Sequence, residues 1–292
     1  MANIVNKALK SIVGKRRWIS AREAYYCYKR TYQRDAELDF IESEHYRKLR
    51  ENIDDPRLVV SRNRIAAYRD KHAGQRCFII GNGPSLNRTD LSLLKNEITF
   101  GSNRIYLMQK RNGFLPTYYV SVNPHVIRQF ADDIQALPMP KFLSFNGVDA
   151  LNAYENTFFI RSPFDQTFRF CYEVNNEVCE GATVTFVMLQ IAFFMGFTSV
   201  YLIGVDHSFA AVGTPHALVE SSGADPNHFD ASYFGKGVKW QLPDLDTSEI
   251  AYNLAKIAFL ADNRIIRDAT IDGKLNVFPK IHYESIFASQ HK

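Results

Sequence analysis

The sequence predicts an α/β fold, a Rossmann-like and mostly parallel sheet flanked by helices. Short apolar runs of strand length recur from residue 76 onward, and helical segments separate several of them, which is the alternation that builds parallel sheets. The run "VYLIGVD" is continuously apolar, as expected of a strand buried on both faces. A glycine-containing turn follows the first run directly, at the end of a strand where such sheets bind ligands.

The expected elements follow in order along residues 73–292. Seven apolar runs are the expected strands: Cys77–Ile80, Ile98–Phe100, Tyr118–Val122, Phe142–Phe145, Phe158–Ile160, Val200–Ile203 and Ile265–Ile266. Three segments are the expected helices: Val126–Leu137, Ala182–Met195 and Ser248–Asn263. The segment from Ala182 is apolar almost all round, which predicts a helix buried in the core.

Residues 207–243 break this alternation. They are rich in Gly, Pro, His, Asp and aromatic residues and show little periodicity. So long an irregular stretch inside a compact domain is typical of an active-site lid or a binding loop. We therefore expect a lid within the domain of residues 73–292.

Residues 1–72 predict a helical and basic appendage. Residues 1–34 hold nine Lys and Arg against one acidic residue, a charge of +8, so the rest of the chain carries 4 − 8 = −4. Basic residues alternating with apolar ones are typical of helices that lie on anionic membrane surfaces. A solvated helix packed on the body is the alternative. We expect no nucleic-acid partner, because the basic surplus does not continue into the body.

The remaining composition favours a cytoplasmic location, at the inner face of the membrane if the basic head binds lipid. The N-terminal stretch lacks the long apolar core of a signal peptide, and no run reaches the length of a membrane span. The four cysteines show neither CxxC spacing nor pairing with histidines. Reduced thiols are therefore expected rather than a disulfide framework or a zinc site.

The turn Gly81-Asn82-Gly83-Pro84-Ser85 predicts a nucleotide or phosphate site. Gly81 and Gly83 permit a tight turn and close approach of a ligand, and Ser85 is a candidate helix N-cap. Leu86 stands where a dinucleotide fingerprint has its third glycine, and the lysine of a P-loop is absent. The site would then use side-chain amides and hydroxyls. A strand-to-helix turn without a ligand is the alternative.

A second turn, Gly101-Ser102-Asn103, follows the next strand. Asn82 and Asn103 would lie on neighbouring strand ends and converge on one base or ribose. An asparagine amide offers both a donor and an acceptor, which suits the edge of a pyrimidine. A helix N-cap is the alternative role of Asn103.

Five segments occur in a fixed order: "IIGNGPSL", "SNRIYL", "YYVSVNP", "GATVTFVMLQIAFFMGFTSVYLIGVD" and "GKLNVFP". Together they resemble the bacterial sialyltransferase superfamily that uses CMP-sialic acid. They are more similar still to two relatives of that superfamily, the motility-associated flagellar glycosyltransferases and the family named after archaeal 6-hydroxymethylpterin diphosphokinase. The resemblance covers residues 76 to 287.

This resemblance implies a nucleotide-binding sheet with a lid, and it implies a set of binding residues. The residues that it places around the nucleotide and sugar of a CMP-sugar are Gly81, Asn82, Gly83, Ser85, Asn103, Asn123, Gly181, Thr183 and Asp206. The chain also departs from the sialyltransferase pattern. His207-Ser208-Phe209 stands where those enzymes have tyrosines that hold the leaving phosphate, and the stretch "WQLPDLDTSE" lacks their histidine base.

The lid offers substitutes for those missing groups. Sugar transfer needs a base for the acceptor hydroxyl and stabilisation of the leaving phosphate. We expect His228 to be the base, with Asp230 as the carboxylate that orients it. His207 and Tyr233 are expected to assist the leaving phosphate. Anchoring of a loop is the alternative role of each histidine.

The expected function is transfer of a nonulosonic acid, such as sialic acid, from a CMP donor to a cell-surface glycan, without a metal or other cofactor. The first rival is diphosphate transfer from ATP to a hydroxymethylpterin with Mg²⁺, whose candidate ligands are Asp206, Asp230, Asp244 and Asp246. The second rival is a non-catalytic module that binds nucleotide sugars. Asp244-Leu245-Asp246 also spells the DxD of metal-dependent glycosyltransferases. A capping box of Asp246 with Glu249 is the preferred interpretation.

Overall fold

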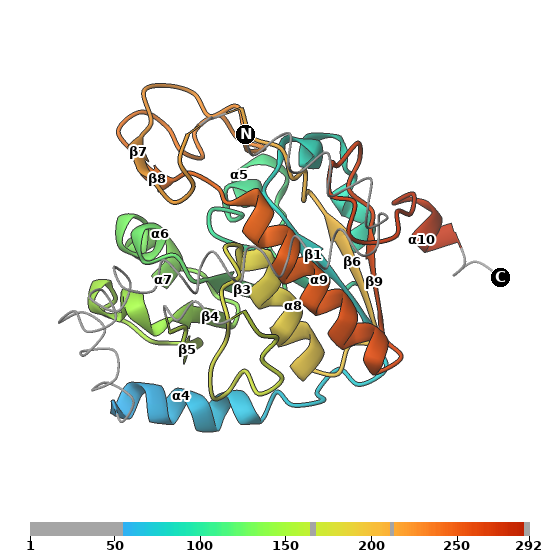
Figure 1. Cartoon of the computed structure of the whole chain (residues 1–292). Helices are drawn as coiled ribbons and strands as arrows, with labels where there is room; N and C mark the ends of the chain where they lie inside the picture. Colours follow the sequence, from blue (N-terminus) through green and yellow to red (C-terminus); the bar gives the residue numbers. More distant parts are fainter. Residues whose placement is uncertain (1–54, 164–167, 211–212, 289–292) are drawn as a thin grey trace, which may run out of the picture. The chain divides into compact units, whose positions relative to one another are not determined.

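The computed structural model describes residues 55–163, 168–210 and 213–288 (Figure 1). The expected basic appendage and its membrane contact therefore lie largely outside the described residues. Seven strands form one parallel sheet in the order β5-β4-β3-β2-β1-β6-β9. Their bounds are β1 Arg76–Ile80, β2 Thr99–Ser102, β3 Tyr118–Ser121, β4 Lys141–Ser144, β5 Thr157–Ile160, β6 Ser199–Ile203 and β9 Ile265–Asp268. The predicted α/β class and all seven predicted strands are confirmed.

The strand order reverses beside β1. The chain adds β2, β3, β4 and β5 outward on one side of β1, and then returns to place β6 and β9 on the other side. In register, Ile80 of β1 is opposite Ile203 of β6, so the turns that follow these two strands lie next to each other. Sheets of this kind bind ligands at the carboxyl ends of the strands, where the order reverses.

Both faces of the sheet are covered by apolar side chains. In β1, Cys77 and Ile79 belong to one buried cluster, and Phe78 and Ile80 belong to the other. The first cluster includes the helices α8 (Val184–Phe194) and α9 (Leu245–Ala261). Shorter helices supply the second: α5 Leu107–Asn112, α6 Pro124–Gln129, α7 Ala131–Gln135 and α10 Ser285–Ala288, with the 3₁₀ turns η2 Pro84–Arg88, η3 Leu91–Leu94 and η4 Phe145–Ala150.

Helix α8 is the buried helix that the sequence predicted. All of its residues except Val184 and Phe193 are buried. Gln190, a polar residue within the helix, is fully buried, and both its amide oxygen and its amide nitrogen form hydrogen bonds. The Oε1 atom accepts from the N–H groups of Cys171 and Cys179 at 3.1 Å, and Nε2 donates to the Cys179 carbonyl at 2.7 Å. Among the described residues, no helix combines the length and apolar character needed to cross a membrane.

Two predicted helices differ from those observed. The expected helix Val126–Leu137 is two short helices, because Phe130 leaves the helical conformation with φ −126° and ψ 28° and places its ring 4.2 Å from the guanidinium carbon of Arg104. The expected helix from Ser248 begins earlier, at Leu245. Its cap is Asp244, which accepts from the Thr247 N–H at 2.9 Å, so the assignment of the cap to Asp246 was wrong.

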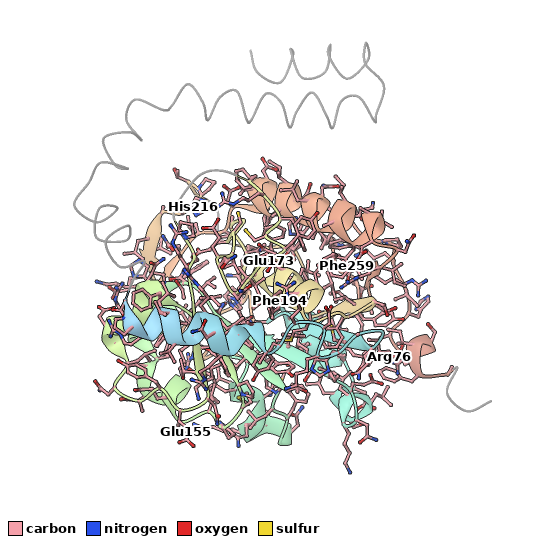
Figure 2. The ribbon with its side chains drawn as sticks, turned by 90° about the horizontal axis from the view of Figure 1, so that it is seen from below. Arg76, Glu155, Glu173, Phe194, His216 and Phe259 are labelled. Carbon is pink, nitrogen blue, oxygen red and sulfur yellow. The ribbon has the colours of Figure 1, made fainter. Side chains whose placement is uncertain are left out.

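Helix α4 (Pro56–Ala66) belongs to the part of the chain that the sequence assigned to the appendage, and it packs against the sheet (Figure 2). Ser61 Oγ accepts from the Phe159 N–H of edge strand β5 at 3.0 Å. After the helix, the ring of Tyr68 packs edge-on against Phe142 and Phe158. Residues 56–68 thus contribute to the core beneath α8.

The lid range contains a small sheet of its own. Strands β7 (Leu218–Glu220) and β8 (Lys239–Gln241) pair in antiparallel fashion. Three aromatic residues of the intervening loop, Phe229, Tyr233 and Phe234, are buried in the second apolar cluster. The segment is therefore packed onto the body through its middle.

Candidate functional site

The turn after β1 and the turn after β6 are packed too closely for side chains. The Gly83 N–H donates to the Gly204 carbonyl at 2.9 Å. A Cβ on Gly81 would lie 2.3 Å from the Gly204 oxygen, and one on Gly83 would lie 2.0 Å from Asp206 Oδ2. Both glycines are needed for this approach between two strand ends, whether or not a ligand also approaches them.

Asp206 holds the glycine turn in place. Its Oδ1 accepts from the Ser85 N–H at 3.0 Å, and its Oδ2 accepts from the Ser85 hydroxyl at 2.6 Å. The residue that precedes η2 as N-cap is Gly83, so the predicted capping role of Ser85 was wrong. Ser85 is buried, and the carboxylate of Asp206 accepts the hydrogen bond from the first turn of η2 that a cap residue would accept.

Asn82 and Asn103 lie on neighbouring strand ends, as the sequence predicted. The Asn82 Nδ2 donates to the carbonyl and hydroxyl oxygens of Ser102, both at 3.2 Å, which fixes the amide. Its Oδ1 is buried and has no hydrogen-bond partner within the part of the chain that the structure describes. Asn103 has a positive φ of 50°, and its Oδ1 accepts from Ser121 Oγ at 3.1 Å. Asn82 therefore presents a buried acceptor that a ligand donor can satisfy.

Asn123 connects α6 to the lid. Its Oδ1 caps α6 by accepting from the His125 N–H at 2.8 Å, and its Nδ2 donates to Gln241 Oε1 of strand β8 at 3.1 Å. One turn further along α6, Gln129 bonds both backbone groups of Lys239, at 2.8 and 3.0 Å. These side chains fasten β8 to α6 beside the carboxyl end of β3.

The start of α8 gathers Gly181, Thr183 and His207. Gly181 has a φ of +55°, and a Cβ there would lie 2.5 Å from the side chain of Ala251 on α9. Thr183 caps α8, and its hydroxyl lies 3.2 Å from the hydroxyl of Tyr252. His207 is almost fully buried, and its Nε2 lies 3.2 Å from Glu249 Oε1. Residues from three distant segments thus meet where α8 and α9 begin.

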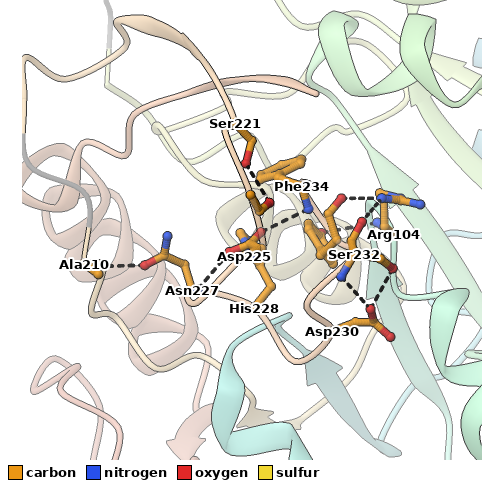
Figure 3. Close-up of polar contacts among 11 residues, drawn as sticks. Arg104, Ala210, Ser221, Asp225, Asn227, His228, Asp230, Ser232 and Phe234 are labelled. Carbon is orange, nitrogen blue, oxygen red and sulfur yellow. Dashed lines mark hydrogen bonds and ion pairs between the residues drawn. The ribbon is translucent and has the colours of Figure 1, made fainter. Parts of the chain in front are cut away.

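In the lid, Asp225 is the centre of a hydrogen-bond network (Figure 3). Its Oδ2 lies 2.7 Å from Nδ1 of His228 and accepts from the Phe234 N–H at 3.1 Å, while Oδ1 accepts from the Asn227 N–H at 2.8 Å. Burial alone would raise the pKa of Asp225, but these hydrogen bonds, with His228 first, lower the pKa below its ordinary value. An ionised Asp225 orients the ring so that Nε2 is the nitrogen left for a substrate.

The predicted partner of His228 was therefore wrong. Asp230 instead accepts from the N–H and the hydroxyl of Ser232, at 2.8 and 2.7 Å. The ring of Tyr233 stacks flat on His228, with centroids 4.0 Å apart, and is almost fully buried. Tyr233 thus packs against one face of the imidazole. Its hydroxyl accepts from the backbone N–H of Arg104 at 3.3 Å.

Hydrogen bonds join the lid to the glycine turn at Phe229, the residue after His228. The Phe229 N–H donates to the Asn82 carbonyl at 2.9 Å, and the Phe229 carbonyl accepts from Asn87 Nδ2 at 2.9 Å. Arg111 donates to the same carbonyl at 2.7 Å. Since Phe229 follows His228 in the chain, these bonds place the backbone of this part of the lid beside the glycine turn.

Three of the four aspartates that a magnesium site would use have separate hydrogen-bond partners. Asp206 holds Ser85, Asp230 holds Ser232, and Asp244 caps α9. Over the described ranges, no three His, Cys, Asp or Glu side chains are grouped as metal ligands.

Sequence reasoning missed Glu180, which precedes the turn into α8. Its Oε1 is buried without a hydrogen-bond partner in the described chain. Burial raises the pKa of Glu180 from 4.5 to about 7, against a smaller lowering by the hydrogen bond from Ser162. Its position four residues before the largely apolar helix α8 was the one available signal.

Comparisons with known proteins identify a family and, among the matching solved structures, a distant similarity in fold. A family model described as 6-hydroxymethylpterin diphosphokinase MptE-like matches residues 44–211, more than half of the chain. No curated protein matches. The structure of the MAf glycosyltransferase from Magnetospirillum magneticum AMB-1 is similar with a TM-score of 0.47 and 15% identity, over 78% of this chain and 39% of that one. The present chain thus spans about two-fifths of that protein's length, and so distant a similarity carries no argument about activity.

Proposed function

This chain belongs to the 6-hydroxymethylpterin diphosphokinase MptE-like family, and from that premise we propose that it is a transferase that binds a nucleotide-activated donor at the carboxyl ends of β1 and β2. More narrowly, the donor is a CMP-linked nonulosonic acid such as sialic acid, and the acceptor is a glycan. The family match ends at residue 211, so the part of the proposal that concerns the lid rests on geometry alone.

The observation that carries the proposal is the buried Oδ1 of Asn82. A buried acceptor left without a donor costs about 1–3 kcal/mol, and a ligand N–H or O–H would offset that cost. The exocyclic amine of cytosine and the hydroxyls of ribose are such donors. The Ser102 contacts hold the amide in one orientation, so the acceptor is already positioned before a ligand binds.

In the proposed reaction, His228 Nε2 removes the proton from the acceptor hydroxyl. The hydroxyl oxygen forms a bond to the anomeric carbon of the sugar, while the bond from that carbon to the phosphate oxygen of CMP breaks. CMP leaves with the electron pair, and the proton stays on His228, where Asp225 stabilises the imidazolium. The positive end of the α8 dipole and His207 stabilise the charge on the leaving phosphate.

Diphosphate transfer from ATP is the second candidate, because the family is named after it. That chemistry requires Mg²⁺ between the phosphates and a protein carboxylate. Asp206, Asp230 and Asp244 are its candidate ligands, and each accepts hydrogen bonds from the protein in this structure. The imidazole–carboxylate pair in the lid can take the proton from a hydroxyl acceptor in either reaction, so the identity of the bound nucleotide decides between them.

A thermal-shift comparison separates these candidates. CMP, CDP or CTP should raise the melting temperature of the full chain, and ATP with Mg²⁺ should not. A response to ATP with Mg²⁺ alone would replace the first proposal by the second. CMP binding without any turnover of a CMP-sugar would leave a non-catalytic binding module.

The Asn82 amide has its own test within the same assay. Asn82→Ala should weaken CMP binding about 10-fold while the unliganded protein still folds, because a single hydrogen-bonded acceptor is lost. Asn112→Ala is the matched control, since Asn112 is exposed and bonds only the nearby Phe114 N–H. Unchanged CMP affinity in Asn82→Ala would reduce the glycine turn to a structural feature.

A further inference from the structure

A second group of polar side chains lies at the carboxyl ends of β4 and β5, away from the glycine turn. The hydroxyls of Ser144 and Ser162 are 2.7 Å apart, and both residues are buried. Asn146 Nδ2 donates to the Ser162 carbonyl at 3.0 Å. These contacts hold three polar side chains in fixed positions at the same edge of the sheet as Asn82.

Glu180 is in contact with this group through Ser162, and one of its two carboxylate oxygens lacks a partner. Its Oε1 is buried and accepts no hydrogen bond within the described residues. The nearest basic side chains in sequence, Arg161 and Arg169, both pair with Glu177. Burial raises the pKa of Glu180, the hydrogen bond from Ser162 lowers it by less, and no charged side chain contributes to the shift. A carboxyl so placed is unfavourable for the folded protein alone, as functional groups often are.

We propose that Glu180, together with Ser162 and Asn146, forms a second ligand subsite, which binds the hydroxyl and amide N–H groups of the sugar on the donor. The inference rests on the proposed function and adds the part of the site that recognises the transferred group. A carboxylate is an acceptor with two oxygens, and a sugar presents several donors at once. Charge-assisted hydrogen bonds of this kind are about twice as strong as neutral ones.

The position of the subsite matches the far end of a nucleotide sugar. β4 lies three strands from β1, and strands are spaced by about 4.8 Å, so about 14 Å separates the two strand ends. A base and ribose held at β1 and β2 do not extend that far. The group that reaches β4 is then the one beyond the phosphate. Residues 180–183 connect the proposed sugar subsite to the start of α8, because the turn that begins at Glu180 leads into this helix.

Calorimetric titration of CMP and of CMP-sialic acid, without acceptor, tests this assignment. In the wild type, CMP-sialic acid should bind more tightly than CMP. Glu180→Gln should weaken CMP-sialic acid binding about 10-fold and leave CMP binding unchanged. Glu155→Gln is the matched control, because Glu155 is exposed in the loop before β5. Equal ratios of the two affinities in wild type and Glu180→Gln would overturn the subsite.

Ionisation gives a readout that a structural role would not move. The ratio of the two CMP-sialic acid dissociation constants, Glu180→Gln over wild type, should grow between pH 6 and pH 8, because only the ionised carboxylate makes charge-assisted bonds. A ratio independent of pH would contradict the proposal. Ser162→Ala, which removes one hydroxyl of the subsite, should reproduce the selective loss of sugar affinity if the first variant folds poorly. Failure of the wild type to bind CMP would instead overturn the proposed function.

Discussion

The glycine turn (residues 81–85 with 204–206) and the lid (residues 207–243) lie next to each other but are held in different ways. The turn is held by backbone groups packed so closely that a single Cβ does not fit at Gly81. One end of the lid is held by side-chain amides, because Asn123 and Gln129 of the α6 segment form hydrogen bonds to strand β8. The turn is thus fixed by close backbone packing, while the β8 end of the lid is fastened by side-chain hydrogen bonds that can open locally.

The largest effect on this comparison is expected from Gly81→Ala. Its Cβ would lie 2.3 Å from a backbone oxygen of Gly204, which cannot move without breaking the β1–β6 pairing. We expect a loss of stability of about 3 kcal/mol, measured by urea unfolding. Gly223→Ala, at a lid glycine where an added methyl group would meet nothing within 4 Å, should change stability by less than about 0.5 kcal/mol. Similar losses in both variants would show that the turn is no more rigid than the lid.

His228→Ala should be next in size. Removal of the proposed base should lower turnover on the order of 100-fold, about 2.7 kcal/mol, with nearly unchanged CMP affinity. His216→Ala is the matched control. It is another lid histidine next to a carboxylate, 3.2 Å from Asp244, but its side chain is 56% exposed. Wild-type turnover in His228→Ala would move the role of base to His207.

Glu180→Gln should stabilise the protein in a pH-dependent way. A carboxyl whose pKa is raised in the folded state is neutral in both states below about pH 4.5, and it lowers stability progressively as the pH rises from there to about 7. The full pKa shift lowers the free energy of unfolding of the wild type by about 3 kcal/mol at pH 8. Glutamine removes this loss, but its buried amide lacks partners and costs about 1 kcal/mol, so we expect a net gain of about 2 kcal/mol.

At pH 4 the gain should give way to a loss of about 1 kcal/mol, because the wild-type carboxyl is then largely protonated in both states and only the cost of the unpaired amide remains. Thermal unfolding of both proteins at several pH values measures this difference. A destabilised Glu180→Gln at pH 8 would mean that the carboxylate serves the fold rather than a ligand.

The smallest effect is expected from Gln129→Ala. Loss of the two hydrogen bonds to Lys239 should lower the local stability at the end of β8 by about 1 kcal/mol. Amide hydrogen exchange at Lys239 should then become about fivefold faster. Gln135→Ala on α7, whose amide oxygen accepts from Asn152 and Ala153, is the control and should leave the lid unchanged. Unaltered exchange in Gln129→Ala would assign the fastening of the lid to its buried aromatic residues.

The sequence by itself determined the elements of the sheet and the position of the glycine turn at the end of β1. Each strand was visible as an apolar run, and α8 as a helix apolar on all sides, because burial on every face removes polar residues from a short local window. The neighbourhood of Asn82 and Asn103 also followed, since consecutive parallel strands joined by a short crossover usually lie side by side.

Only the tertiary structure decided which polar groups pair. Ser85 and Asp206 are 121 residues apart, so no local pattern reveals that the carboxylate replaces the predicted cap. His228 has aspartates both three residues before and two residues after it, and the fold of the loop selects Asp225. The unpartnered oxygen of Glu180 likewise depends on what surrounds it in space. Periodicity records the average burial of a segment, whereas a hydrogen bond requires two atoms within about 3 Å, and the whole fold sets that distance.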